Sequence, residues 1–259
     1  MKRSYKDVAI KAALESGLFI KRSVGKIKSI TYKGRINIVT DVDVKAERII
    51  IKIIRDAFPD HSILSEETEA PIAEGHSPYK WIIDPLDGTT NFAHSFPFFC
   101  VSIGLEKDGR IILGVVYDPS RDELFFAEKG KGAYLNKKRI AVSKASKLGE
   151  GFLATGFGYG IKEAGDDNIR NFKNFLMRSL GVRRAGSAAL DLCYVACGRF
   201  DGFWELYLHP WDTAAGALIV REAKGTVTRF DGSAYTPYNS DVLATNGRLH
   251  PQMVKTLKC

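Results

Sequence analysis

The sequence is poor in the residues that staple small proteins together or bind soft metals. Its 259 residues include four cysteines, five histidines and three methionines. No two cysteines form a Cys-x-x-Cys or Cys-x-x-His pair, and a chain of this length can bury a core without staples. Cys193 and Cys197 lie four residues apart in a helical pattern, and we interpret them as core residues rather than zinc ligands.

Long apolar runs are also missing. No hydrophobic segment is long enough to cross a bilayer, and the first residues, up to Lys28, are charged and helical in pattern, unlike a signal peptide. Hydrophobic residues make up 45% of the chain and charged residues 26%, as in ordinary globular proteins. We therefore expect a cytoplasmic protein without membrane contact, forming a single domain over residues 1–259 whose halves divide at about 147/148.

The net charge of +8 admits two interpretations. A basic surface can bind nucleic acid, but the basic residues are scattered, with small clusters only at Lys137–Arg139 and Arg183–Arg184. An enzyme that handles anionic substrates accounts for the charge equally well. We therefore do not expect nucleic acid as a partner.

The hydrophobic periodicity predicts helices and strands in blocks rather than in strict βαβ order, which favours layered α and β structure. An extended hairpin or loop is expected over residues 33–40. The expected helices cover residues 4–24, 41–57, 167–180, 186–197 and 213–223, with a last one from about 251. The expected strands cover residues 62–64, 79–83, 98–106, 110–118, 123–128, 151–155, 202–205, 226–230 and 242–245.

The most informative stretch runs from Trp81 to Thr90. Its apolar start predicts a buried strand that ends at Asp84, and Asp87 follows three residues later across a Pro turn. Both carboxylates and the Leu86 carbonyl can therefore converge on one point. Oxygen ligands of this kind select magnesium, calcium or manganese. A polar turn with Asp caps remains the alternative.

Glycine and threonine follow directly. Gly88-Thr89-Thr90 is expected to open a helix or a tight turn, where exposed N–H groups bind a phosphate oxygen. Gly88 has no side chain that would block the approach of the phosphate. One short segment can thus offer metal ligands and a phosphate cradle.

Two other segments add carboxylates. Glu66 and Glu67 follow a short apolar strand, and a solvated loop is the alternative role for them. Asp212 follows Pro210-Trp211 at a predicted helix start, where an N-cap is the alternative.

Taken together, Glu-Glu, Asp-Pro-Leu-Asp-Gly-Thr and Trp-Asp-Thr-Ala-Ala resemble the signature of the inositol monophosphatase family, one of the lithium-sensitive, magnesium-dependent sugar phosphatases. Val39 to Asp43, Asn91-Phe92 and Gly186 to Leu192 fit in order, so the resemblance covers the whole chain. It implies an α+β fold, an α-β-α-β-α sandwich of the inositol monophosphatase and fructose-1,6-bisphosphatase type. It also implies a homodimer.

The resemblance implies a ligand set for magnesium. Glu66, Asp84 and the Leu86 carbonyl would hold a first ion, and Asp84, Asp87 and Asp212 would hold a second. A third, weaker ion would sit near Glu66 through water.

Further roles are implied for catalysis and substrate binding. Thr89, aided by Asp43, would orient or help deprotonate the attacking water, with Glu66 also in a catalytic role. The Gly88 and Thr89 amides would bind the phosphate. The substrate pocket would be lined by Asp87, Gly186, Ser187, Ala188 and Glu205.

Some details depart from the animal enzymes and resemble microbial members. Arg183-Arg184 precedes Gly186, and Thr155-Gly156-Phe157-Gly158 replaces a Ser-rich loop. Arg184 could meet a second phosphate bidentately, or pair with Asp191 or a partner subunit.

The expected activity is hydrolysis of a small sugar or polyol phosphate, inositol 1-phosphate first and fructose 1,6-bisphosphate second. The alternatives are a 3′-phosphoadenosine 5′-phosphate or NADP phosphatase, and a regulatory protein that binds the transcription machinery.

Overall fold

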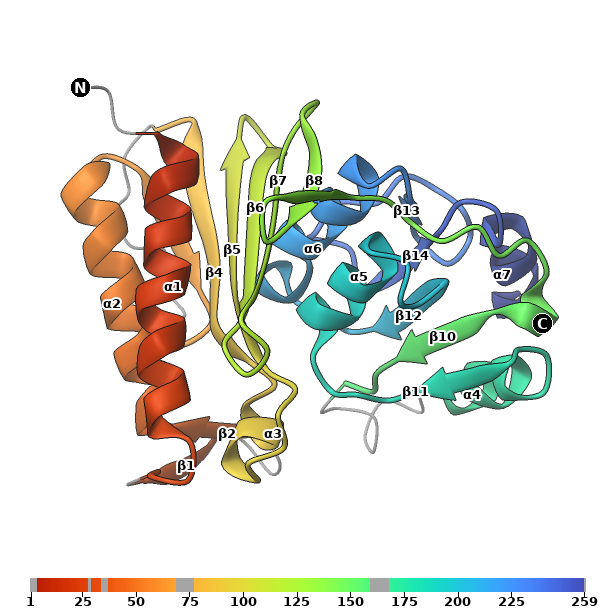
Figure 1. Ribbon diagram of the computed structural model, residues 1–259, viewed down its shortest axis with the longest axis horizontal. Helices are drawn as coiled ribbons and strands as arrows, with labels where there is room; N and C mark the ends of the chain where they lie inside the picture. The colour runs from red at the N-terminus through yellow and green to blue at the C-terminus, as the bar shows by residue number, and fades with distance from the viewer. Residues whose placement is uncertain (1–3, 28, 34–36, 69–76, 159–167, 259) are drawn as a thin grey trace.

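The chain folds into five alternating layers of helix and sheet (Figure 1). The computed structural model describes residues 4–27, 29–33, 37–68, 77–158 and 168–258. Helices α1 (Tyr5–Ser23) and α2 (Asp41–Ala57) cover the outer face of a seven-stranded sheet, and α5 (Ala188–Ala196) and α6 (Pro210–Glu222) lie between this sheet and a five-stranded one. Helices α4 (Asn168–Leu176) and α7 (His250–Leu257) form the last layer. The expected α-β-α-β-α sandwich is confirmed.

The seven-stranded sheet has the order β3-β4-β5-β6-β7-β8-β9. Only β3 pairs in parallel, with β4, and the other neighbours are antiparallel. Its strands are β3 (Ser62–Ser65), β4 (Tyr79–Asp87), β5 (Cys100–Lys107), β6 (Arg110–Asp118), β7 (Glu123–Glu128), β8 (Gly132–Leu135) and β9 (Lys138–Ile140). The expected hairpin near residue 33 is β1 (Ile30–Lys33) paired with β2 (Asn37–Thr40).

The five-stranded sheet has the order β11-β10-β12-β14-β13. Strand β10 pairs in parallel with both neighbours, whereas β14 is antiparallel to β12 and β13. The strands are β10 (Phe152–Thr155), β11 (Gly181–Arg183), β12 (Gly202–Leu206), β13 (Thr226–Thr228) and β14 (Asp241–Thr245), and the 3₁₀ turn η1 (Leu148–Glu150) precedes β10.

The structure differs from the sequence expectations at four of these elements. The helix expected over residues 167–180 ends at Leu176, and the edge strand β11, which is too short to show a period, was not foreseen. Helix α6 begins at Pro210 rather than at residue 213, because proline suits the first turn of a helix. Strand β4 does not end at Asp84 but continues to Asp87.

A bulge allows β4 to continue through Pro85. Asp84 pairs with Ser102 and Asp87 pairs with Cys100, so β4 carries one residue more than β5 over this stretch. The extra residue leaves a position outside the ladder, where proline, which has no N–H to donate, is tolerated. The bulge thereby sets the direction of both aspartates.

Helix α6 lies very close to the middle of the seven-stranded sheet. A Cβ added to Gly104 would lie 3.0 Å from the Ala214 Cβ, and one added to Gly114 would lie 2.6 Å from the Ala215 carbonyl oxygen. The two glycines therefore leave room for the backbone of α6. This contact sets the height of α6 above the sheet just after its first turn.

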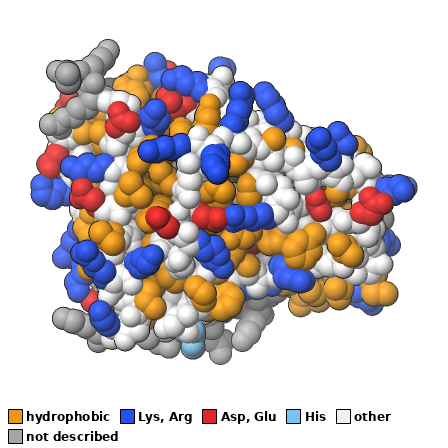
Figure 2. Space-filling view, viewed as in Figure 1, with side chains coloured by type: hydrophobic (Ala, Val, Ile, Leu, Met, Phe, Trp, Pro, Cys, Tyr) orange, Lys and Arg blue, Asp and Glu red, His pale blue; other side chains and the backbone are white. Residues whose placement is uncertain are grey.

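Two general surface features bear on the sequence expectations. No helix in the described part of the chain has both the length and the apolar character needed to cross a membrane. On the face shown in Figure 2, Lys and Arg side chains are spread among acidic and apolar ones.

An aromatic cluster closes the outer end of the α1–α2 layer. The His61 ring stacks between Phe58 and Tyr79, with centroids 4.8 and 4.7 Å away. The Trp81 indole N–H donates to His61 Nδ1 at 3.1 Å. An indole nitrogen can only donate, so Nδ1 must be unprotonated. Burial lowers the pKa of His61, partly opposed by the charge of Asp60.

We predict that His61 makes the fold sensitive to acid. Because its folded pKa is lowered, its stabilising contribution is complete above the ordinary value of 6.5 and is lost as the pH falls below it. In His61→Gln, a neutral acceptor replaces Nδ1. Urea unfolding at pH 7.5 and pH 5 should show that this variant loses less stability on acidification than the wild type. The exposed His94, changed to Gln, is the control, and equal losses in all three proteins would contradict the prediction.

Candidate metal and phosphate site

A cavity of about 650 Å³ lies where the two halves of the chain meet. Its walls come from the end of β4, the start of α3 (Thr89–Ala93), the loop before α5, and the segment from β12 to α6. The sequence-predicted residues that line it are Glu66, Asp84, Leu86, Asp87, Gly88, Thr89, Arg184, Gly186, Ser187, Ala188, Glu205 and Asp212.

The two β4 aspartates are fixed in different ways. Asp84 is buried, and its Oδ1 accepts a hydrogen bond from the Leu86 N–H at 2.9 Å. Asp87 Oδ2 accepts from the Ser187 hydroxyl at 2.6 Å and from the Ala189 N–H at 2.8 Å. The first turn of α5 therefore holds Asp87 from the other half of the chain.

Thr89 connects this segment to α2. Its hydroxyl lies 2.9 Å from Asp43 Oδ1 and 3.0 Å from the Leu86 carbonyl oxygen, and its single proton serves one of them at a time. Asp43 is buried at the start of α2, where its Oδ2 accepts from the Thr40 N–H at 2.9 Å. Burial raises the pKa of Asp43, and the bonds from Thr40 and Thr89 oppose this shift.

Glycine is required at the turn before Thr89. Gly88 has φ of 91°, in the left-handed region that other residues rarely adopt. A Cβ there would also lie 2.9 Å from the Phe98 carbonyl oxygen. The turn therefore presents its backbone to the cavity without a side chain in front of it.

Asp212 reaches the cavity from the first turn of α6. The alternative interpretation of Asp212 as the N-cap was wrong, because His209 is the N-cap and Asp212 is the third residue of the helix. Asp212 Oδ2 accepts from the His209 N–H at 2.6 Å. The late helix start that sequence analysis expected, at residue 213, hid this arrangement.

Glu66 and Glu67 separate after β3. Glu66 lines the cavity, whereas Glu67 lines a different groove, beside Arg48 and Lys52 of α2. The two carboxylates therefore lie in different places. Only Glu66, for which the sequence analysis expected a metal-binding role, lines the cavity.

Burial raises the pKa of these carboxylates, and neighbouring charges add to the shift at Asp84 and Asp212. The pKa of Asp84 is well above its ordinary value because of burial, followed by the charges of Glu66, Asp87 and Asp212. Burial raises the pKa of Asp87 to about 6, with the Ser187 bond opposing it. Burial and the charge of Asp87 also raise the pKa of Asp212 well above normal.

Glu205 and Asp191 form a second pair of interacting carboxyl groups. Burial raises the pKa of Glu205 to about 8, with Arg184 opposing the shift. Asp191 is buried below it on α5, and its Oδ1 has no hydrogen-bond partner among the described residues. Its pKa is raised well above normal by burial and by Glu205. No ion pair joins Arg184 to Asp191 in the described chain, contrary to one of the sequence alternatives.

The chemistry of this cavity suits a hard divalent cation. Among the described residues that line it, five carboxylates face one Lys or Arg side chain, Arg184. Buried charges of one sign need a counter-charge, and oxygen donors match magnesium. No three His, Cys, Asp or Glu side chains of the described segments already converge closely enough to hold an ion together.

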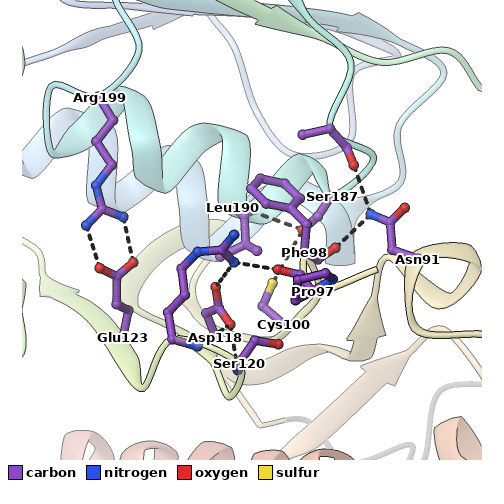
Figure 3. A network of polar contacts seen from close by, with 12 residues as sticks. Asn91, Pro97, Phe98, Cys100, Asp118, Ser120, Glu123, Ser187, Leu190 and Arg199 are labelled. Atoms are coloured by element: carbon purple, nitrogen blue, oxygen red, sulfur yellow. Dashed lines mark hydrogen bonds and ion pairs between the residues drawn. The ribbon is translucent and has the colours of Figure 1, made fainter. Parts of the chain in front are cut away.

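Some residues at the cavity were not foreseen as part of it. Trp211 and Tyr207 line its rim, and the Trp211 ring stacks on His209 with centroids 4.8 Å apart. Asn91 does not itself line the cavity, but it lies next to the Asp-Gly-Thr motif and bonds to the loop before α5, which does (Figure 3). Its position beside that motif was the signal that could have indicated it.

Known proteins resemble this chain over nearly its whole length. The model of the inositol monophosphatase family matches residues 1–259. An inositol-1-monophosphatase from Synechocystis sp. is 45% identical over 256 residues, covering 98% of this chain and 89% of that protein. A Nus factor SuhB from Pseudomonas aeruginosa is 42% identical over 260 residues, with 97% and 95% covered.

The solved structures give the same result. An inositol monophosphatase from Anabaena (Nostoc) sp. matches with a TM-score of 0.89 and 43% identity, over 97% of this chain and 94% of that one. The expected fold and enzyme class, a phosphoric monoester hydrolase, are confirmed with this match. With its family signature matched from end to end and its acidic motifs gathered in one cavity, the chain belongs to the inositol monophosphatase family.

Proposed function

We propose that this protein hydrolyses a small sugar or polyol phosphate with magnesium as its cofactor. Inositol 1-phosphate is the first candidate substrate, and fructose 1,6-bisphosphate is the second. The observation that carries the proposal is the meeting of Asp84, Asp87 and Asp212, from both halves of the chain, beside the Gly88–Thr89 turn in one cavity.

Five groups would hold the metal ions. Glu66, Asp84 and the Leu86 carbonyl would bind one magnesium, and Asp84, Asp87 and Asp212 would bind another, with a third, weaker ion near Glu66. Bound magnesium supplies a water of lowered pKa and a counter-charge for the leaving oxygen. Asp87 Oδ2 is already used by Ser187 and Ala189, so Oδ1 is the oxygen that faces this task.

Thr89 and Asp43 can take a proton from the attacking water. The Thr89 hydroxyl donates to Asp43 Oδ1, which leaves its oxygen lone pairs to accept a hydrogen bond from a water. When that water gives up its proton to Thr89 Oγ1, the hydroxyl proton moves to Asp43 Oδ1. The raised pKa of Asp43 makes this carboxylate a better acceptor than an exposed one.

The remaining walls suit the two ends of the substrate. The backbone N–H groups of Gly88 and Thr89 would bind the phosphate. Glu205 and the Gly186–Ala188 backbone would contact the polyol. With a pKa of about 8, the Glu205 carboxyl keeps a proton at neutral pH and can donate to a hydroxyl oxygen. Arg184 would meet a second phosphate.

Other proposals rest on narrower observations. Apolar side chains on and after α4 are exposed, among them Ile169 at 62% and Met177 at 76%. We propose that they pack in a homodimer, which light scattering would test.

A cytoplasmic location and the NADP or 3′-phosphoadenosine 5′-phosphate activities remain predictions. The relative called a Nus factor keeps a transcription-binding role as the rival function, which a pull-down from nuclease-treated lysate would test.

Metal dependence should be absolute. We expect full loss of activity in EDTA and recovery with magnesium, because all the ligands are oxygen atoms. Calcium should bind and inhibit, since its looser geometry misplaces the water. The assay is phosphate release from inositol 1-phosphate, fructose 1,6-bisphosphate, NADP and 3′-phosphoadenosine 5′-phosphate. Undiminished turnover in metal-free protein would end the proposal.

Lithium chloride should inhibit phosphate release at millimolar levels. Sodium chloride is the control.

Asp212→Asn should separate metal binding from helix capping. Asn can still accept the His209 N–H bond, so a purely structural role predicts little change. Loss of the charge should lower turnover about 100- to 1000-fold and raise the magnesium level needed for half activity. The melting temperature without metal should stay level or rise, because one carboxylate with a raised pKa has left the group. Near-normal turnover would remove Asp212 from the site.

Arg184→Ala should change substrate preference more than turnover. A bidentate Arg–phosphate contact contributes roughly 1.5–3 kcal/mol per charged bond, so kcat/KM for fructose 1,6-bisphosphate should fall at least about tenfold more than for inositol 1-phosphate. Arg183→Ala is the matched control, because the Arg183 guanidinium lies over the Phe152 ring at 4.7 Å. Equal losses for both substrates would assign Arg184 a structural role.

A further inference from the structure

Three carbonyl groups converge on one side-chain amide at the edge of the cavity. Asn91 Nδ2, on α3, donates to the Phe98 carbonyl at 2.7 Å and to the Ala185 carbonyl at 2.8 Å, with the Gly186 carbonyl at 3.4 Å. The two short bonds use both of its protons. Figure 3 shows Asn91 between the two chain segments.

The two segments belong to different halves of the chain. Ala185 and Gly186 are in the β11–α5 loop (residues 184–187), whereas Phe98 lies just before β5. The β11–α5 loop lines the cavity with Arg184, Gly186 and Ser187. Its Ser187 end is bonded to Asp87, and its Ala185 end is bonded to Asn91. The first half of the chain therefore holds this loop at both ends.

The loop is shaped to approach Asn91. Gly186 has φ of 91°, and a Cβ on it would lie 3.1 Å from Asn91 Nδ2 and 2.9 Å from Arg184 Nη1. The Arg184 side chain therefore lies beside the same backbone that Asn91 holds. A shift of the loop away from α3 would move Arg184 and the Gly186 backbone together.

We propose that Asn91 is a positioning residue: it clamps the β11–α5 loop against the Gly88–Thr89 turn, so that Arg184 and the phosphate-binding backbone face one substrate. The proposal rests on the function proposed above. Asn91 itself is not among the residues that line the cavity. Asn91 acts through the loop. It is on α3, the same short helix that the Gly88–Thr89 turn opens.

Asn91→Asp tests the clamp with little change of shape. A carboxylate cannot donate, and it would face the same carbonyl oxygens with a negative charge, so the loop should move away. The matched control is Asn246→Asp. Asn246 Nδ2 donates to Ser143 Oγ and to the Ala145 carbonyl, both at 2.9 Å, outside the cavity. If Asn91→Asp does not fold, Asn91→Ser keeps a donor that is too short to span both carbonyls.

Two measurements decide the matter. Hydrogen exchange of residues 184–188 should speed up at least about tenfold in Asn91→Asp and stay unchanged in Asn246→Asp. With fructose 1,6-bisphosphate, the double variant Asn91→Asp/Arg184→Ala should lose less kcat/KM than the two single losses combined, because both changes remove the same contact. In the double variant Asn246→Asp/Arg184→Ala, the two losses should be additive. Unchanged exchange together with additive losses would overturn the proposal. A wild-type protein inactive on every phosphate tested would refute the proposed function, and the exchange comparison would still decide the clamp.

Discussion

The main constraint on this structure is that it must hold several buried carboxylates in one cavity. Asp84, Asp87 and Asp212 line one cavity with Glu66, and burial raises the pKa of each aspartate, with neighbouring carboxylate charges adding to the shift at Asp84 and Asp212. The packing of the apolar layers supplies the free energy that holds these buried groups near one another.

The supporting bonds differ among the aspartates. Asp87, from the first sheet, accepts hydrogen bonds from the start of α5 in the other half of the chain. Asp84 and Asp212 each accept a bond from a neighbouring backbone N–H, and Asp212 enters the cavity from the start of α6. Both helices lie in the layer between the two sheets (Figure 1). Neither half therefore contains a complete site, and the packing of the central layer determines how the acidic groups face each other.

The sequence predicted the elements with long, regular periods and the residues within recognisable motifs. Helix α2 has the expected bounds, and Asp84, Asp87 and Thr89 do share a cavity with Asp212. The bulge at Pro85 could not be foreseen, because it depends on the register with β5 rather than on local sequence. Strand β11 was missed since three residues show no period, and the role of Asn91 depends on carbonyl groups almost a hundred positions away.

The glycine contact beneath α6 has a consequence for how the site responds to motion. Because Gly104 and Gly114 let the helix backbone rest directly on the strands, no flexible side chain separates Asp212 from the sheet that carries Asp84. Rotamer changes in the core cannot alter that spacing, so thermal fluctuation reaches it only through movement of whole backbone elements. The distance between the two halves of the site is thus set by direct contact between the α6 backbone and the backbone of the sheet.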